Sequence, residues 1–240
     1  MPTHEETLKR LAATFTAKDI MTPRSALICG NDEPEAIRAS SEHADFDVIP
    51  IMPGGELTGY FERDSQRTSS IEVNDLISDG TSLIDLVDIF EHRKFSFVLS
   101  HQYVNGYVHY SDLNHQLVKL TFYVLLEAVQ KHALRLIGPR ANDKNYLARV
   151  LGESRAEQIE NYYNDAGQAG RTLSNYLNIS DILKLAIREG VTEFDGTIVK
   201  SMKKARDGAA HVLENLVSSY GDVNNLAQVK REGLRILGGV

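Results

Sequence analysis

The segment from Lys200 to His211 holds the residue types in this sequence that are best suited to chemistry. If the segment is helical, Asp207 and His211 lie four residues apart on one polar side, with Arg206 on its flank. A histidine titrates near neutrality and suits proton transfer, whereas an arginine offers a fixed cationic fork to a phosphate. A neighbouring carboxylate orients and charges such a histidine. These three side chains predict metal-independent cleavage of RNA, in which a ribose 2′-hydroxyl attacks the adjacent phosphate.

The opposite side of the same helix is expected to face the protein core, because its apolar residues recur at helical spacing. This stripe consists of Ile198, Met202, Ala205, Ala209, Val212, Leu213 and Leu216. Gly208 and Ala210 are small enough for another backbone or a ligand to approach closely. The alternative for the polar side is a solvated face laced with salt bridges, as on most charge-rich helices.

The pattern Arg206-Asp207-x-x-x-His211 resembles the last core helix of the HEPN family. Ribonuclease members of that family carry Arg, a polar residue, three further residues and His, and many are toxins or antiviral effectors. The resemblance covers about residues 117–220. It implies that Arg206 and His211 are catalytic and that Asp207 supports them. It also implies a homodimer with a shared cleft and single-stranded RNA as the substrate.

The second half of the chain is predicted to be entirely helical, because its apolar residues are periodic and its breaks fall at glycines. The simplest arrangement is a bundle of five helices. The expected helices are Leu113–Ile137, Tyr146–Ala166, Leu173–Ile187, Thr197–Val217 and Val223–Leu237.

The first half alternates short apolar runs, rich in aromatic and β-branched residues, with helical patterns, which predicts strands and helices in alternation. The expected strands are Asp47–Met52, Leu57–Phe61, Phe95–Ser100 and Val104–Tyr110. A helix is expected around Leu83–Phe90, and Asn105-Gly106 is expected to form a turn or bulge. The pattern Gly59-Tyr60-Phe61 returns as Gly106-Tyr107-Val108, which indicates an internal repeat of about 50 residues.

The start Asp19-Ile20-Met21-Thr22-Pro23, followed by the two repeats, resembles a tandem CBS pair over about residues 15–120. The resemblance implies a sensor for an adenosyl ligand, an adenine nucleotide such as AMP, ADP or ATP. It implies that Asp112 binds the ribose hydroxyls and that His109 stands where the family contacts phosphate. Asp64 is the counterpart of Asp112 in the first repeat. The alternative for Asp112 is a cap on the helix that follows it.

Composition restricts the class of protein. The chain has 240 residues, 42% of them hydrophobic and 25% charged, and a net charge of −7, as in an ordinary globular protein. The lone Cys29 excludes an intrachain disulfide framework and a multi-cysteine zinc site. Residues 1–120 carry a net charge of −9 and residues 121–240 one of +2. No signal peptide, membrane span or metal site is expected, and the cytoplasm is the predicted location.

Together these patterns predict an α+β protein, a two-repeat α/β CBS pair followed by an all-α HEPN-like bundle. The expected domains are residues 1–118 and 119–240. The predicted function is a metal-independent RNA endonuclease regulated by an adenine nucleotide at the CBS pair. A continuous helix Leu113–Ile137 would carry a rearrangement from one domain to the other. The alternative is a non-catalytic nucleotide-sensing protein that dimerises or docks through its helical half.

Overall fold

The computed structural model describes residues 14–27, 46–166, 170–211 and 213–238. The chain divides into two compact units, which meet in sequence between His115 and Gln116. The unit before this point contains all the described strands, and the unit after it is helical. The predicted α+β class is therefore confirmed at this level.

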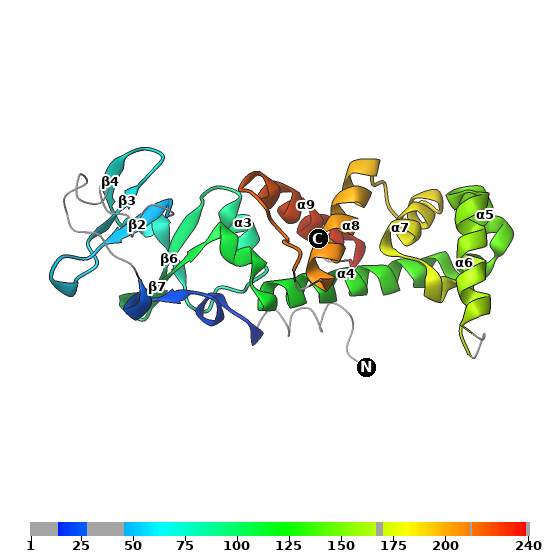
Figure 1. Ribbon diagram of the computed structural model, residues 1–240, viewed down its shortest axis with the longest axis horizontal. Helices are drawn as coiled ribbons and strands as arrows, with labels where there is room; N and C mark the ends of the chain where they lie inside the picture. The colour runs from blue at the N-terminus through cyan, green and yellow to red at the C-terminus, as the bar shows by residue number, and fades with distance from the viewer. Residues whose placement is uncertain (1–13, 28–45, 167–169, 212, 239–240) are drawn as a thin grey trace. The chain divides into compact units, whose positions relative to one another are not determined.

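The main sheet of the first unit is built on a hairpin (Figure 1). Its strands, in order across the sheet, are β1 (Thr22–Pro23), β7 (Tyr103–His109), β6 (Phe95–Ser100) and β5 (Leu76–Ser78). Strands β5 and β6 are parallel, and helix α3 (Leu86–Phe90) lies between them in sequence, whereas the other pairs are antiparallel. The helix is shorter than the sequence predicted. The segment Pro34-Glu35-Ala36-Ile37, which matches Ser82-Leu83-Ile84-Asp85 in the internal repeat of the sequence, lies outside the described residues.

A second, antiparallel sheet consists of β2 (Val48–Ile51), β3 (Gly59–Glu62) and β4 (Arg67–Ser70). The buried side chains of Ile49, Ile51 and Phe61 form a core cluster of this sheet. Strands β2 and β3 were predicted from their apolar residues. Strand β4 was missed because its four residues are polar and exposed, so that no hydrophobic alternation marks it.

Gly106 shows why the predicted irregularity falls in β7. The register shifts so that Val98 faces Gly106 while Leu99 faces Val104, which leaves Asn105 as the extra residue of a bulge. A Cβ atom on Gly106 would lie 2.8 Å from the carbonyl oxygen of Thr22, so only glycine lets β1 approach this closely. The turn-or-bulge prediction is confirmed as a bulge.

The helical unit is organised around a long helix, α4, against which α7, α8 and α9 pack, while α5 and α6 pair at its C-terminal end (Figure 1). Its helices are α4 (Gln116–Ile137), α5 (Lys144–Leu151), α6 (Glu153–Asp165), α7 (Ile179–Arg188), α8 (Gly196–Ala210) and α9 (Gly221–Ile236). Phe122, Leu125, Leu126 and Val129 of α4 are fully buried, as expected of a central helix.

Several of the predicted helices were wrong in extent, among them Leu173–Ile187, in which α7 begins only at Ile179. The expected helix Tyr146–Ala166 is two helices, because Gly152 has a φ of +94° and breaks the backbone between α5 and α6. The expected helix from Leu113 is also interrupted. A 3-10 helix spans Tyr110–Asn114, His115 is extended, and α4 begins only at Gln116. No continuous helix therefore leads from the first unit into the second.

Candidate functional site

The end of β7 presents two of the predicted nucleotide ligands. His109 is the last residue of β7 and caps the 3-10 helix Tyr110–Asn114. The carboxylate of Asp112 accepts a hydrogen bond of 2.8 Å from the backbone N–H of His109. The ring Nδ1 of His109 lies 2.8 Å from the hydroxyl of Ser111. Asp112 therefore stabilises the start of the 3-10 helix in which it lies, as the third residue of a capping box, and does not cap a helix that follows it.

The third predicted ligand, Asp64, is linked to this group of polar residues by Lys94, which was not predicted from the sequence. Lys94 forms an ion pair with Asp64, and this hydrogen bond raises the pKa of the lysine. Asp47 interacts with both Lys94 and His109. It interacts electrostatically with Lys94, and its carboxylate is 3.6 Å from Nε2 of His109. We call Asp47, Asp64, Lys94, His109 and Asp112 the β7 cluster.

The register of the β6–β7 hairpin explains how Lys94 reaches this place. Phe95 pairs with His109, so the residue before β6 lies beside the residue after β7. The backbone N–H of Tyr110 accordingly donates to the carbonyl oxygen of Lys94 at 2.8 Å. Aligning the two predicted strands about their connection would have brought Lys94 to the end of β7.

Burial shifts the pKa values of the two titratable groups at the end of β7 in opposite directions, and each shift favours the neutral form of its group. Desolvation lowers the pKa of His109, and the nearby Asp47 carboxylate opposes this shift. Desolvation raises the pKa of Asp112, and the hydrogen bond from His109 opposes it. The lowered pKa of His109 disfavours a positive charge on its ring, so Lys94 is the cation of the β7 cluster.

The lowered pKa of His109 predicts a pH dependence of stability. Because the folded-state pKa lies below the ordinary 6.5, the unfolded chain binds more protons, and stability falls as the pH drops below about 6.5. In His109→Gln the free energy of unfolding should depend less on pH between about 6.5 and 5. Urea unfolding across this range measures the slope. The exposed His92→Gln is the control, and an unchanged slope in His109→Gln would contradict the assignment.

Aromatic rings line the inner side of the β7 cluster and join the two sheets. The rings of Tyr60 and Phe95 meet edge to face at a centroid distance of 4.9 Å, and Phe95 stacks on Tyr107 at 5.8 Å. The ring of His109 lies 6.4 Å from that of Tyr107 and 4.3 Å from that of Tyr110. Burial raises the pKa of Tyr107, in keeping with its place in this packed group.

The predicted catalytic residues lie at the C-terminal end of α8. Arg206 and Asp207 are in the helix, but α8 ends at Ala210 and His211 has extended backbone angles. The prediction that the helix continues to Val217 was wrong. Leu213, expected in the core stripe, is 97% exposed, whereas Leu216 is buried as expected. Val212 lies outside the described residues.

The charges around these residues are paired differently from the prediction. The carboxylate of Asp207 accepts a hydrogen bond of 2.6 Å from Lys203, one turn earlier, instead of meeting His211. A nitrogen of Arg206 lies 3.9 Å from Asp207, and its guanidinium lies 6.0 Å from the ring centre of Tyr123 on α4. The ring of His211 is exposed and has no hydrogen-bond partner among the described residues.

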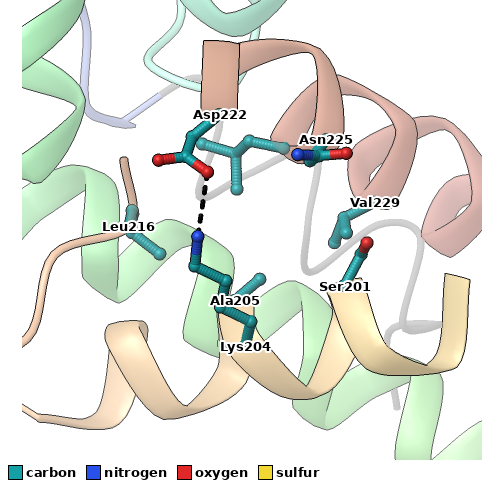
Figure 2. A pocket seen from close by; sticks show the side chains of 8 residues that line it. Ser201, Lys204, Ala205, Leu216, Asp222, Asn225 and Val229 are labelled. Carbon is teal, nitrogen blue, oxygen red and sulfur yellow. Dashed lines mark hydrogen bonds and ion pairs between the residues drawn. The ribbon is translucent and has the colours of Figure 1, made fainter. Parts of the chain in front are cut away.

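Lys204 also forms an ion pair, with Asp222 near the start of α9 (Figure 2). The distance between the lysine nitrogen and the carboxylate oxygen is 2.8 Å. This ion pair lies at a small pocket between α8 and α9, which Ser201 and Asn225 also line. The pocket has a volume of about 40 Å³, which accommodates a few water molecules rather than a nucleotide. Part of the polar side of α8 thus forms the salt-bridged face that the sequence left as an alternative.

The chain after α8 turns back on the helix and is fixed at two points. The buried ammonium group of Lys119, on α4, donates to the carbonyl oxygens of His211 and Glu214. Gly208 lets the backbone return, since a Cβ atom there would lie 2.8 Å from the carbonyl oxygen of Asn215. Gly208 was predicted to allow the close approach of another backbone, and the backbone that approaches it is that of Asn215 in the same chain.

This close approach predicts that Gly208→Ala destabilises the helical unit by about 1–3 kcal/mol, despite the better helix propensity of alanine. Gly196→Ala, at the start of the same helix, is the matched control, because its Cβ would meet no atom within 4 Å. The difference between the two midpoints of thermal unfolding measures the effect. Equal midpoints would show that the returning segment does not constrain position 208.

Two further findings concern metals and membranes. Among residues 14–27, 46–166, 170–211 and 213–238, no group of three histidine, cysteine, aspartate or glutamate side chains is arranged to hold a metal ion. Within the same ranges, the helices lack the length and apolar character needed to traverse a bilayer.

Comparisons with known proteins give no match to a family model and none to a curated protein. The solved structures that are similar to this chain include two CBS domains. One is the CBS domain of the bacterial CNNM/CorC family Mg²⁺ transporter in complex with ATP, with 17% identity and a TM-score of 0.37, covering 48% of this chain and 96% of the other. The second is the CBS domain of the same transporter family in complex with the inhibitor IGN95a, with 17% identity and a TM-score of 0.36, covering 49% and 86%.

Proposed function

We propose that the unit of residues 14–115 is a tandem CBS pair that binds an adenine nucleotide at the β7 cluster. The observation that carries the proposal is the ring of His109. Its Nε2 atom is buried and lacks a hydrogen-bond partner, since the nearest carboxylate oxygen, on Asp47, lies at 3.6 Å. Leaving a buried polar atom unsatisfied costs about 1–3 kcal/mol, which a ligand oxygen or a bound water would offset.

The neighbouring groups suit the two polar parts of a nucleotide. Lys94 supplies a cation for phosphate, and the Asp112 carboxylate, through its remaining acceptor capacity, suits the ribose hydroxyls. Asp64 holds Lys94 until phosphate competes for it. The base would meet an apolar surface, since aromatic residues pack beside the cluster.

Isothermal titration calorimetry with AMP, ADP and ATP tests this proposal. We expect saturable binding of one nucleotide per chain and weaker binding to Asp112→Ala, whose fold is checked by circular dichroism. The absence of measurable binding at millimolar concentrations of all three nucleotides would refute it.

The second proposed function belongs to the helical unit: metal-independent cleavage of single-stranded RNA by a homodimer of HEPN type. The observation that favours it is the exposed and unpartnered ring of His211 on a backbone held by Lys119. Arg206 lies five residues earlier, at the same end of α8. Asp207 then supports Arg206 through their 3.9 Å contact, and does not orient His211.

Regulation joins the two proposals, since a nucleotide bound by the first unit would alter the rate of cleavage by the second. Incubating labelled RNA with the protein in EDTA, with and without ATP, tests cleavage and its regulation together. The cleavage products should carry 2′,3′-cyclic phosphate ends. If the RNA stays intact under every nucleotide condition, the helical unit is a docking or dimerisation module instead.

A further inference from the structure

Three arginines line a cavity in the helical unit that neither proposed site uses. Arg140 comes from the 3-10 helix Gly138–Asn142, Arg149 from α5, and Arg188 is the last residue of α7. Their side chains surround a cavity of about 380 Å³, within the range of small-ligand sites. All three residues are exposed.

The two carboxylates in the cavity wall are already engaged by protein groups. The carboxylate of Glu189 accepts a 2.6 Å hydrogen bond from the hydroxyl of Tyr146 and also binds Arg140. The Tyr146 hydroxyl and Arg140 lower the pKa of Glu189, which keeps it ionised and holds Arg140 in place. The carboxylate of Asp143 accepts hydrogen bonds from the backbone N–H groups of Asn145 and Tyr146 at the start of α5.

Arg149 and Arg188, by contrast, form no ion pair with a carboxylate among the residues that the structure describes, although Arg188 is near enough to Glu189 to help lower the pKa of that carboxyl group. The guanidinium of Arg149 lies 5.9 Å from the ring centre of Tyr146, which orients it without neutralising its charge. Three arginines and two carboxylates give the cavity wall a net positive charge. Two planar guanidinium groups with free N–H donors suit the oxygens of a phosphate group.

The other residues that line the cavity favour the binding of a charged group over the binding of a nucleotide base. Val150 is the only aliphatic side chain among the described lining residues, and the Tyr146 ring is buried beneath Arg149. From this arrangement we infer that the cavity binds the phosphate or pyrophosphate group of a small phosphorylated molecule, with Arg149 and Arg188 as its principal ligands and Arg140 as a third.

Inorganic pyrophosphate is the probe for this site, used with the full chain in calorimetry at low salt. We expect binding with a Kd below about 1 mM. Arg149→Gln and Arg188→Gln should each weaken it about tenfold, because each removes charge-assisted hydrogen bonds. Neither substitution touches the core, and circular dichroism verifies the fold.

Two control variants locate the binding. Lys184→Gln removes an exposed charge from the same helix as Arg188 but does not line the cavity, and Lys18→Gln removes an exposed charge from the other unit, outside the β7 cluster. Both should bind pyrophosphate as the wild type does. The inference fails if pyrophosphate does not bind, if Lys184→Gln weakens it equally, or if only a single-stranded RNA oligonucleotide binds.

Discussion

Replacing His211 with alanine is expected to lower the rate of RNA cleavage in EDTA by at least about 100-fold, the usual contribution of a general acid or base. His211 has an exposed ring, and its backbone is held by the Lys119 ammonium group rather than by its own side chain. The variant should therefore unfold at the same temperature as the wild type. Arg206→Ala should lower the rate to a similar extent by removing the cation that offsets charge on the phosphate.

Matched controls separate catalysis from contamination and from loss of fold. His92→Ala removes an exposed histidine from the other unit and should leave cleavage unchanged. Asp207→Asn should have a smaller effect than His211→Ala, because Asp207 pairs with Lys203 and not with His211. Cleavage that persists in both His211→Ala and Arg206→Ala would show that these residues do not carry the activity.

Lys94→Gln is expected to weaken ATP binding at least tenfold while changing adenosine binding little. Lys94 is the cation of the β7 cluster, and its loss leaves the carboxylates of Asp47 and Asp64 to repel the triphosphate. Parallel titrations with ATP and adenosine measure the two effects. The ratio of the two affinities isolates the phosphate contribution from any general loss of binding.

Lys18→Gln is the control for this experiment, because it removes an exposed positive charge from the same unit. It should bind ATP and adenosine as the wild type does. An equal loss of ATP affinity in both lysine variants would indicate attraction by overall charge rather than a phosphate site at Lys94.

Hydrophobic pattern predicted most elements of the fold but not their ends. The strands of the β6–β7 hairpin and the apolar side of α4 follow from residue periodicity. The periodicity of apolar residues does not predict the backbone angles of a single residue. Gly152 breaks one expected helix in two with a positive φ, and His115 interrupts another. Strand β4 has only polar residues and is defined by pairing with β3, a long-range property.

The candidate sites were predicted in part, for the same reason. Spacing pointed to Arg206 and His211, and the family resemblance implied His109 and Asp112, because both depend on residues that are close together in the sequence. Neither selected Lys94, which reaches the β7 cluster through the β6–β7 register, or Asp47, which lies 3.6 Å from His109. Helical geometry also placed Asp207 beside His211, but the end of α8 at Ala210 removes that pairing.

A crystal structure of the full chain grown with saturating ATP tests the central proposal most directly. We predict a nucleotide at the β7 cluster, with its ribose beside Asp112 and its phosphates beside Lys94 in place of Asp64. We also predict that Nε2 of His109 gains a hydrogen-bond partner, from the nucleotide or from a water that the nucleotide orders. A nucleotide bound elsewhere, or a β7 cluster with the Lys94–Asp64 pair intact at saturating ATP, would refute the proposed site.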